Sequence, residues 1–286
     1  KFCYVNLLRL KDHFEEMSDA IYPYDYPLAL AYMKCEERYP QFRELKFQAL
    51  KKIRFAVDLD TYILCYAYFR WFDNIIDSYK LLGGDIFHVV DRQKRFLEQL
   101  YKKEDPEEIS AEELFLAHLV KYDLKFSKGM RKSLETLMST FEFDAKRRHK
   151  IVKKYELEEY TKNNAQPYVD ISLSIFNFQI SDEHKNRLYE IANAGFIVDY
   201  VWNLNTDINL GHINISEEEV KQFGIDVSNI DSDGVRAWTK SKLQDINNVF
   251  SQKGYLSGLP ILGKVIAWKM LYHRQEKIER IISNDY

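Results

Sequence analysis

The sequence predicts an all-α protein. Only 10 glycines and 6 prolines punctuate the 286 residues, and long tracts contain neither, which favours helices over a turn-rich β architecture. With 46% hydrophobic residues the chain can bury a large core, and we find no internal repeat or long linker. We therefore predict one helical domain over residues 41–286, with an N-terminal extension over residues 1–40 that packs on it.

The helices of the first half are predicted from apolar stretches and the breaks between them. The Tyr- and Pro-rich run at residues 22–27 indicates an irregular entry. A break near Asp58 precedes an apolar helix that carries Asp73 and Asp77 and closes at Gly83-Gly84. Apart from that apolar helix, the helices predicted in this half cover residues 28–39, 42–54, 87–102 and 111–122.

In the second half, residues 128–143 lead to Asp144 and the basic cluster at residues 146–150. We expect a long helix over residues 157–178 that Pro167 interrupts. Ser181 is a predicted N-cap for a helix that runs on through Asp207. The remainder is predicted as a polar connector over residues 211–233 and two helices over residues 234–253 and 262–283.

Charge and cysteine content exclude several function classes. A formal net charge of -3 provides no basic field for nucleic acid. The three cysteines lack CxxC or Cys/His metal spacing, which favours reduced thiols over disulfides or zinc. No apolar run is long enough to span a membrane, so we expect a cytoplasmic protein, with peripheral membrane contact left open. A monomer and a homodimer are both open, and because the chain begins at Lys1 an upstream targeting segment is also open.

The run Tyr66-Ala-Tyr-Phe-Arg70-Trp-Phe-Asp73-Asn-Ile-Ile-Asp77 is the first candidate site. Asp73 and Asp77 are four residues apart and therefore share one helix face. Two neighbouring carboxylates repel each other unless a cation lies between them, and Mg²⁺ prefers one or two carboxylates together with substrate phosphates. Arg70 brings a phosphate-binding guanidinium to the same face. The alternative is a solvated helix end with two unrelated acids.

A second polar stripe follows in the helix after Ser181. Asp199, Asn203 and Asp207 have i, i+4, i+8 spacing in a mainly apolar segment. They form either a set of interhelical hydrogen bonds or, with Asp73 and Asp77, a cavity that holds metal ions around a diphosphate.

Together these residues resemble the squalene and phytoene synthase family, over about residues 40–280. The resemblance implies an isoprenoid synthase helical bundle around a central cavity. Its first aspartate motif corresponds to Tyr66–Asp77, and its second, with the loop that follows, to residues 203–225. Further matching positions are Phe143-Asp144, Arg147, Tyr160, Gly258-Leu-Pro and Tyr272.

The resemblance implies a role for each matching residue. Mg²⁺ would be the cofactor and an isoprenyl diphosphate the substrate. The implied magnesium ligands are Asp73, Asp77, Asn203 and Asp207, with Asp199 as a further candidate. Arg70 would lie near phosphate, as would Arg43 and Lys46 just before Phe47. The tyrosines implied to point into the cavity are Tyr66, Tyr160 and Tyr272.

The sequence departs from the family pattern at two places. Gly211 stands where the second motif usually has another acid, and Thr206 stands where an arginine usually precedes Asp207. Where the family has a small Val-Ala-Gly step, this chain has Asn164-Ala165-Gln166-Pro167-Tyr168. We expect Gln166 and Tyr168 to shorten or polarise the space for prenyl chains.

Three functions stay open. The family default is head-to-head coupling of two allylic diphosphates. The second is single-prenyl chemistry: cyclisation, hydrolysis, or transfer to a small polar acceptor near Gln166, Asp170 and Ser172. The third is a non-catalytic relative that acts in assembly. No GxGxxG segment is present, and we do not predict a nicotinamide cofactor.

Overall fold

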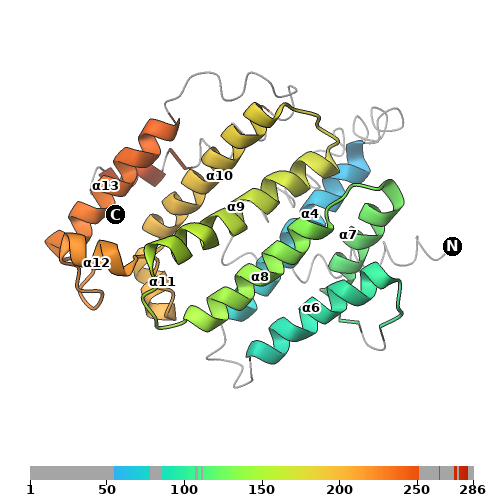
Figure 1. The fold of residues 1–286 in the computed structure, drawn as a ribbon, viewed down its shortest axis with the longest axis horizontal. Helices are drawn as coiled ribbons and strands as arrows, with labels where there is room; N and C mark the ends of the chain where they lie inside the picture. Colours follow the sequence, from blue (N-terminus) through green and yellow to red (C-terminus); the bar gives the residue numbers. More distant parts are fainter. Residues whose placement is uncertain are drawn as a thin grey trace, which may run out of the picture. The chain divides into compact units, whose positions relative to one another are not determined.

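The computed structural model confirms the all-α class, because every regular element in its described part is a helix (Figure 1). The structure describes residues 55–77, 86–106, 109–110, 112–250, 264, 274–275 and 277–282. The chain divides into two compact units, residues 1–131 and 132–286, which are described separately below.

Three helices of the first unit are described: α4 (Phe55–Asp77), α6 (Ile86–Lys102) and α7 (Glu113–Phe126). α7 packs against both α4 and α6. The buried face of α4 carries Tyr68, Phe69, Phe72 and Ile76. Each such side chain stabilises the fold by roughly 1.5–3 kcal/mol through burial, so packing holds the C-terminal half of α4, where the first acidic pair lies.

A buried polar network that the sequence did not predict joins these helices. The Tyr68 hydroxyl donates to Gln93 Oε1 at 2.7 Å, and Gln93 Nε2 donates to Glu113 Oε1 at 2.8 Å. Arg92 binds the same carboxylate through Nε and NH2, and the Ser110 amide donates to its Oε2. Burial raises the pKa of Glu113, but these hydrogen bonds outweigh it and leave the pKa below its usual value.

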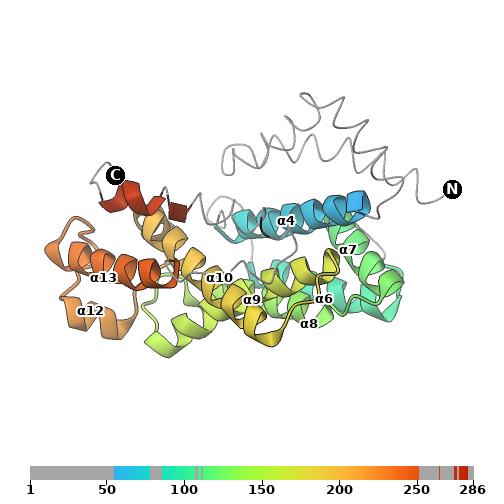
Figure 2. The same ribbon diagram turned by 90° about the horizontal axis from the view of Figure 1, so that it is seen from above.

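The second unit contains α9 (Lys154–Ile175), α10 (Asp182–Trp202), α11 (Leu204–Leu210), α12 (Glu217–Phe223) and α13 (Asp233–Phe250). α8 (Arg131–Arg147) begins at the boundary between the units and leads into this unit. α10 lies between α9 and α13 and packs against both (Figures 1 and 2). The core around α10 includes Val198, Ile215 and Trp238.

Three sequence-based expectations in this unit were wrong. α9 continues through Pro167, which is buried, so tertiary packing outweighs the lost backbone hydrogen bond. The helix that Ser181 caps ends at Trp202, and Asn203, with φ -94° and ψ 7°, separates it from α11. The supposed connector over residues 211–233 contains α12, whose capping box joins Ser216 and Glu219.

The break expected near Asp58 was also wrong, because α4 is helical from Phe55 through that residue. Other expectations agree within a few residues or lie outside the described part. Ser181 is the N-cap of α10 and accepts a hydrogen bond from the His184 amide. The boundary predicted at residue 40 and the helices expected over residues 28–39 and 42–54 fall outside the described residues. No helix among the described residues is both long and apolar enough to cross a membrane.

Candidate functional site

The first motif forms a stripe along the C-terminal half of α4. Tyr66, Arg70, Asp73 and Asp77 follow i, i+4, i+7, i+11 spacing, and all four are half-buried. Arg70 NH1 lies 2.7 Å from Asp73 Oδ2, and 36% of the Asp73 side chain is exposed. The carboxylates therefore line a half-exposed edge next to the buried face of α4.

The second motif is arranged differently from the straight stripe that its spacing suggested. Asn203 is exposed and occupies the junction between α10 and α11. Asp207 is half-buried in the first turn of α11 and accepts a 2.9 Å hydrogen bond from Asn214 Nδ2 at its Oδ2. Asn214 itself is buried. Sequence reasoning missed this residue, which gave no signal beyond its place in the loop after the motif.

Arg147 connects Asn214 to Asp144, which is buried. Its Nε donates to Asp144 Oδ1 at 2.7 Å, and its NH2 donates to Asn214 Oδ1 at 2.9 Å. The Arg147 side chain is only 3% exposed. The Tyr160 hydroxyl donates to the other oxygen of Asp144 at 2.5 Å. A continuous chain of hydrogen bonds thus leads from Tyr160 to Asp207.

Aromatic rings surround the Arg147 end of this chain of bonds. The Arg147 guanidinium carbon lies 4.5 Å from the ring centroid of Tyr160, which also stacks on Tyr200 at 6.2 Å. Burial, followed by the charge of Asp144, raises the pKa of Tyr160 well above its usual value. Burial lowers the pKa of Arg147, but the charge of Asp144, its hydrogen bond and the neighbouring Tyr160 and Tyr200 together outweigh burial, and the net shift is upward. Tyr160 is neutral and Arg147 is charged at physiological pH.

Asp199 lies one turn before Asn203 but has cationic partners of its own. Arg274 NH2 lies 2.9 Å from Asp199 Oδ2, and Lys277 Nζ lies 2.7 Å from Oδ1. Both bases belong to the C-terminal helical segment, drawn in red beside α10 in Figure 2. Each carboxylate oxygen thus accepts a charge-assisted hydrogen bond from protein.

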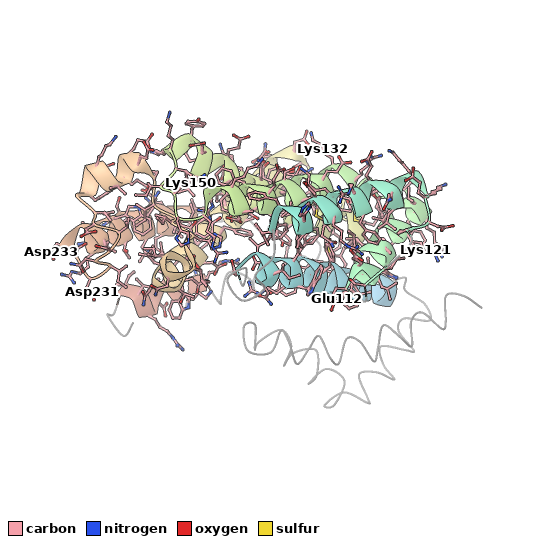
Figure 3. All side chains as sticks on the ribbon, turned by 90° about the horizontal axis from the view of Figure 1, so that it is seen from below. Glu112, Lys121, Lys132, Lys150, Asp231 and Asp233 are labelled. Carbon is pink, nitrogen blue, oxygen red and sulfur yellow. The ribbon has the colours of Figure 1, made fainter. Side chains whose placement is uncertain are left out.

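The backbone conformation explains why glycine stands at position 211, at the incomplete end of the second motif. Gly211 caps α11 with φ +92°, in the left-handed region. A Cβ there would lie 2.6 Å from the His149 ring, and the His149 amide donates to the Gly211 carbonyl at 2.7 Å. His149 belongs to the turn after α8, next to Lys150, which Figure 3 labels. The backbone here requires glycine, whereas a metal ligand requires a side chain.

The residues that replace the small step lie in the middle of α9. The Tyr168 ring stacks on Phe196 at 6.1 Å, and Gln166 is half-buried. Asp170 accepts a 2.6 Å hydrogen bond from Tyr189 and pairs with Lys185 at 2.7 Å. The Ser172 hydroxyl donates to the Tyr168 carbonyl of its own helix. Asp170 and Ser172 thus already have protein partners.

A separate pocket of about 210 Å³ lies in the second unit between α9, α10 and α13. Leu157, Ile197, Tyr200 and Trp238 contribute to its lining, and Asn214 reaches it from the loop after α11. None of the predicted metal ligands lines this pocket.

The described residues fit magnesium better at the first motif than at the second. Asp73 and Asp77 supply the one or two carboxylates that Mg²⁺ prefers. In the second motif Asp207 shares an oxygen with Asn214, Asp199 is paired with two bases, and Gly211 has no side chain. No three acidic, histidine or cysteine side chains in the described part are grouped to hold a metal. Arg43, Lys46, Phe47 and Tyr272 lie outside the described residues.

Solved structures of two synthases share this fold. The squalene synthase HpnC from Alicyclobacillus acidocaldarius superposes with a TM-score of 0.62 at 18% identity, over 78% of this chain and 81% of the other. A dehydrosqualene synthase, solved in complex with a ligand, gives a TM-score of 0.58 at 14% identity, over 86% and 77%. No protein-family model and no curated protein matches the sequence. The fold implied by the sequence resemblance is thereby confirmed.

Proposed function

We propose that this chain is a Mg²⁺-dependent prenyltransferase of the squalene and phytoene synthase type. In this proposal it ionises an allylic prenyl diphosphate and couples the cation head-to-head to a second prenyl diphosphate. The observation that carries the proposal is the stripe of Tyr66, Arg70, Asp73 and Asp77 on α4, in a chain with the fold of two such synthases.

The residues of α4 would act on the leaving group. Magnesium bound at Asp73 and Asp77 would neutralise charge on the departing diphosphate. Arg70 supports this role because its guanidinium already lies on the carboxylate edge, where it could donate to phosphate oxygens as well as to Asp73. The allylic carbon–oxygen bond breaks with its electron pair leaving on diphosphate. The resulting cation alkylates the alkene of the second substrate, and loss of a proton closes a cyclopropane ring.

Asp207 would act with a carboxylate whose orientation is already restricted. Its bond to Asn214, and through Asn214 to Arg147, holds one oxygen in a single direction. A carboxylate that is already held in position binds a metal more tightly and stabilises charge more effectively. Tyr160 supports the same site as a positioning residue, because its hydroxyl is committed to Asp144.

Single-prenyl chemistry is the second candidate, and the bulk on α9 favours it. Tyr168 stacks on Phe196 where the family pattern has small residues, and this leaves less room for a second chain. Transfer to a polar acceptor is less favoured in the form first considered, because Asp170 and Ser172 are bonded within the protein.

Product analysis separates these functions. The chain is incubated with geranyl, farnesyl or geranylgeranyl diphosphate and Mg²⁺, and the products are identified by mass spectrometry. A product that contains two prenyl units supports coupling. An alcohol or cyclic hydrocarbon with one prenyl unit would replace coupling with the second candidate. No diphosphate release from any of the substrates would contradict both and favour a non-catalytic role in assembly.

A further inference from the structure

Asp199 has the position expected of a metal ligand, yet the protein provides its counter-charges. Its two carboxylate oxygens lie 2.9 Å from Arg274 NH2 and 2.7 Å from Lys277 Nζ, one base for each oxygen. The three side chains are between 19% and 30% exposed, so water screens them only in part. The Lys277 ammonium also lies 5.8 Å from the centroid of the Trp202 ring.

α10 is shaped to receive Arg274. Gly195 is buried one turn before Asp199, and a Cβ at this position would lie 2.5 Å from Arg274 Nε and 2.9 Å from its Cδ and Cζ. Glycine is unfavourable inside a helix unless packing requires it. The absence of a side chain at Gly195 lets the guanidinium lie directly against the helix. The contact with Arg274 is therefore built into α10 and is more than a chance surface pairing.

A divalent ion at Asp199 would meet two obstacles. It would have to displace a charge-assisted hydrogen bond from a carboxylate oxygen, and it would then lie within a few ångströms of two positive charges. Asn203, the next residue along the stripe, is exposed at the helix junction, and Gly211 offers no ligand. The residues around Asp199 consequently do not fit the magnesium ion that the sequence suggested.

We propose that Arg274 and Lys277 form a built-in cation pair that takes the place of a metal ion at Asp199. In this arrangement the α10 side of the second motif carries fixed protein charge, and divalent-metal binding in this motif is left to Asp207. This inference rests on the proposed function, because that function is what assigns a metal ion to the second motif.

Mn²⁺ binding to the full chain tests whether Arg274 and Lys277 take the place of a metal ion at Asp199. Mn²⁺ alone is the probe, and electron paramagnetic resonance is the readout. We expect Asp199→Asn to bind Mn²⁺ with the affinity of the unaltered protein to within twofold, and to melt several degrees lower. Asp170→Asn is the matched control, since Asp170 is also paired with a lysine but lies outside both motifs. A tenfold loss of Mn²⁺ affinity in Asp199→Asn alone would overturn the proposal.

A gain of binding provides the second arm. The Arg274→Met/Lys277→Met variant should bind one Mn²⁺ more than the unaltered protein, and addition of Asp199→Asn should remove that extra ion. Lys277→Met alone should gain weaker binding, and serves if the double variant fails to fold. No gain in a folded variant would contradict the proposal. Absence of prenyl diphosphate turnover by the unaltered protein would refute the proposed function. The Mn²⁺ binding results test the cation pair independently of turnover.

Discussion

Asn214 donates a 2.9 Å hydrogen bond from Nδ2 to Oδ2 of Asp207, and its carbonyl oxygen accepts one from Arg147. The two ends of one amide are therefore assigned by their partners, because a carboxylate only accepts and a guanidinium only donates. Because Arg147 and Asp144 are buried and bonded to each other, they hold Asn214 in place, and Asn214 in turn fixes the orientation of the Asp207 carboxylate. The first two predictions concern this relationship.

Replacement of Asn214 should weaken metal binding without unfolding the protein. We expect Asn214→Ala to lower Mn²⁺ affinity and diphosphate release by about 10- to 100-fold, the usual effect of removing a ligand's hydrogen-bond partner. Isothermal titration and a diphosphate assay measure the two effects. Asn209→Ala is the matched control, because Asn209 is exposed on the same short helix and bonds only to Asn205 among the contacts described. Equal effects of both substitutions would contradict the positioning role.

Arg147 should be among the most important residues for stability in the second unit. Arg147→Met leaves Asp144 buried without its cation, and loss of one partner of a buried pair costs about 3–5 kcal/mol. Urea unfolding measures this cost. The adjacent Lys146→Met removes an exposed pair with Glu142 and should cost less than about 1 kcal/mol. A similar free energy of unfolding for the two variants would show that the network contributes little.

The acidic ligands should be required for chemistry and dispensable for folding. We expect Asp73→Ala and Asp207→Ala each to reduce diphosphate release by about 100-fold or more, because charge on the leaving group loses its stabilisation. Circular dichroism should remain that of a helical protein. Asp91→Ala, an exposed acid on α6, is the control and should be active. Near-normal release from Asp73→Ala and Asp207→Ala would refute the metal assignment.

An acid at position 211 should not restore the family motif. Gly211 has φ +92°, and a side chain would meet His149, so Gly211→Asp and Gly211→Ala should both destabilise the protein. Gly224→Ala is a matched comparison with φ +61° and open space around the glycine. That control carries only the left-handed strain of about 1–2 kcal/mol, and the Gly211 variants should cost at least twice as much. Chemical denaturation measures the free energy of unfolding of each variant. Equal losses at positions 211 and 224 would show that contact with His149 adds no cost.

Stability should fall in acid partly through Glu113. Its pKa in the folded protein is lower than in the unfolded chain, so its contribution is present above about pH 4.5 and is lost as pH falls towards the folded pKa. Glu113→Gln should flatten the decline in unfolding free energy between pH 5 and 3, as urea midpoints would show. Glu190→Gln, an exposed control on α10, should leave the slope unchanged. An unchanged slope in Glu113→Gln would contradict the assignment.

Local features of this fold were readable because they depend on neighbours in the chain. Ser181 was identified as an N-cap because a serine oxygen can accept from a backbone amide three residues on, and it does. The Ser216/Glu219 capping box carries the same kind of signal, and α12 could have been predicted from it.

The sequence by itself determined the helical class, the stripe of Tyr66, Arg70, Asp73 and Asp77, and the resemblance that led to the fold. Periodicity and spacing within one helix are enough for these, since i and i+4 always share a face. Only the tertiary structure showed that Asp199 forms ion pairs with Arg274 and Lys277. It also showed that Asp207 is hydrogen-bonded to Asn214, which is in turn bonded to Arg147. Three of these four pairs are separated by 67 to 78 residues, and no local pattern encodes which distant cation or amide will pair with a given side chain. Folding selects that partner, because a partly buried charge must be compensated by whichever group the packing brings near.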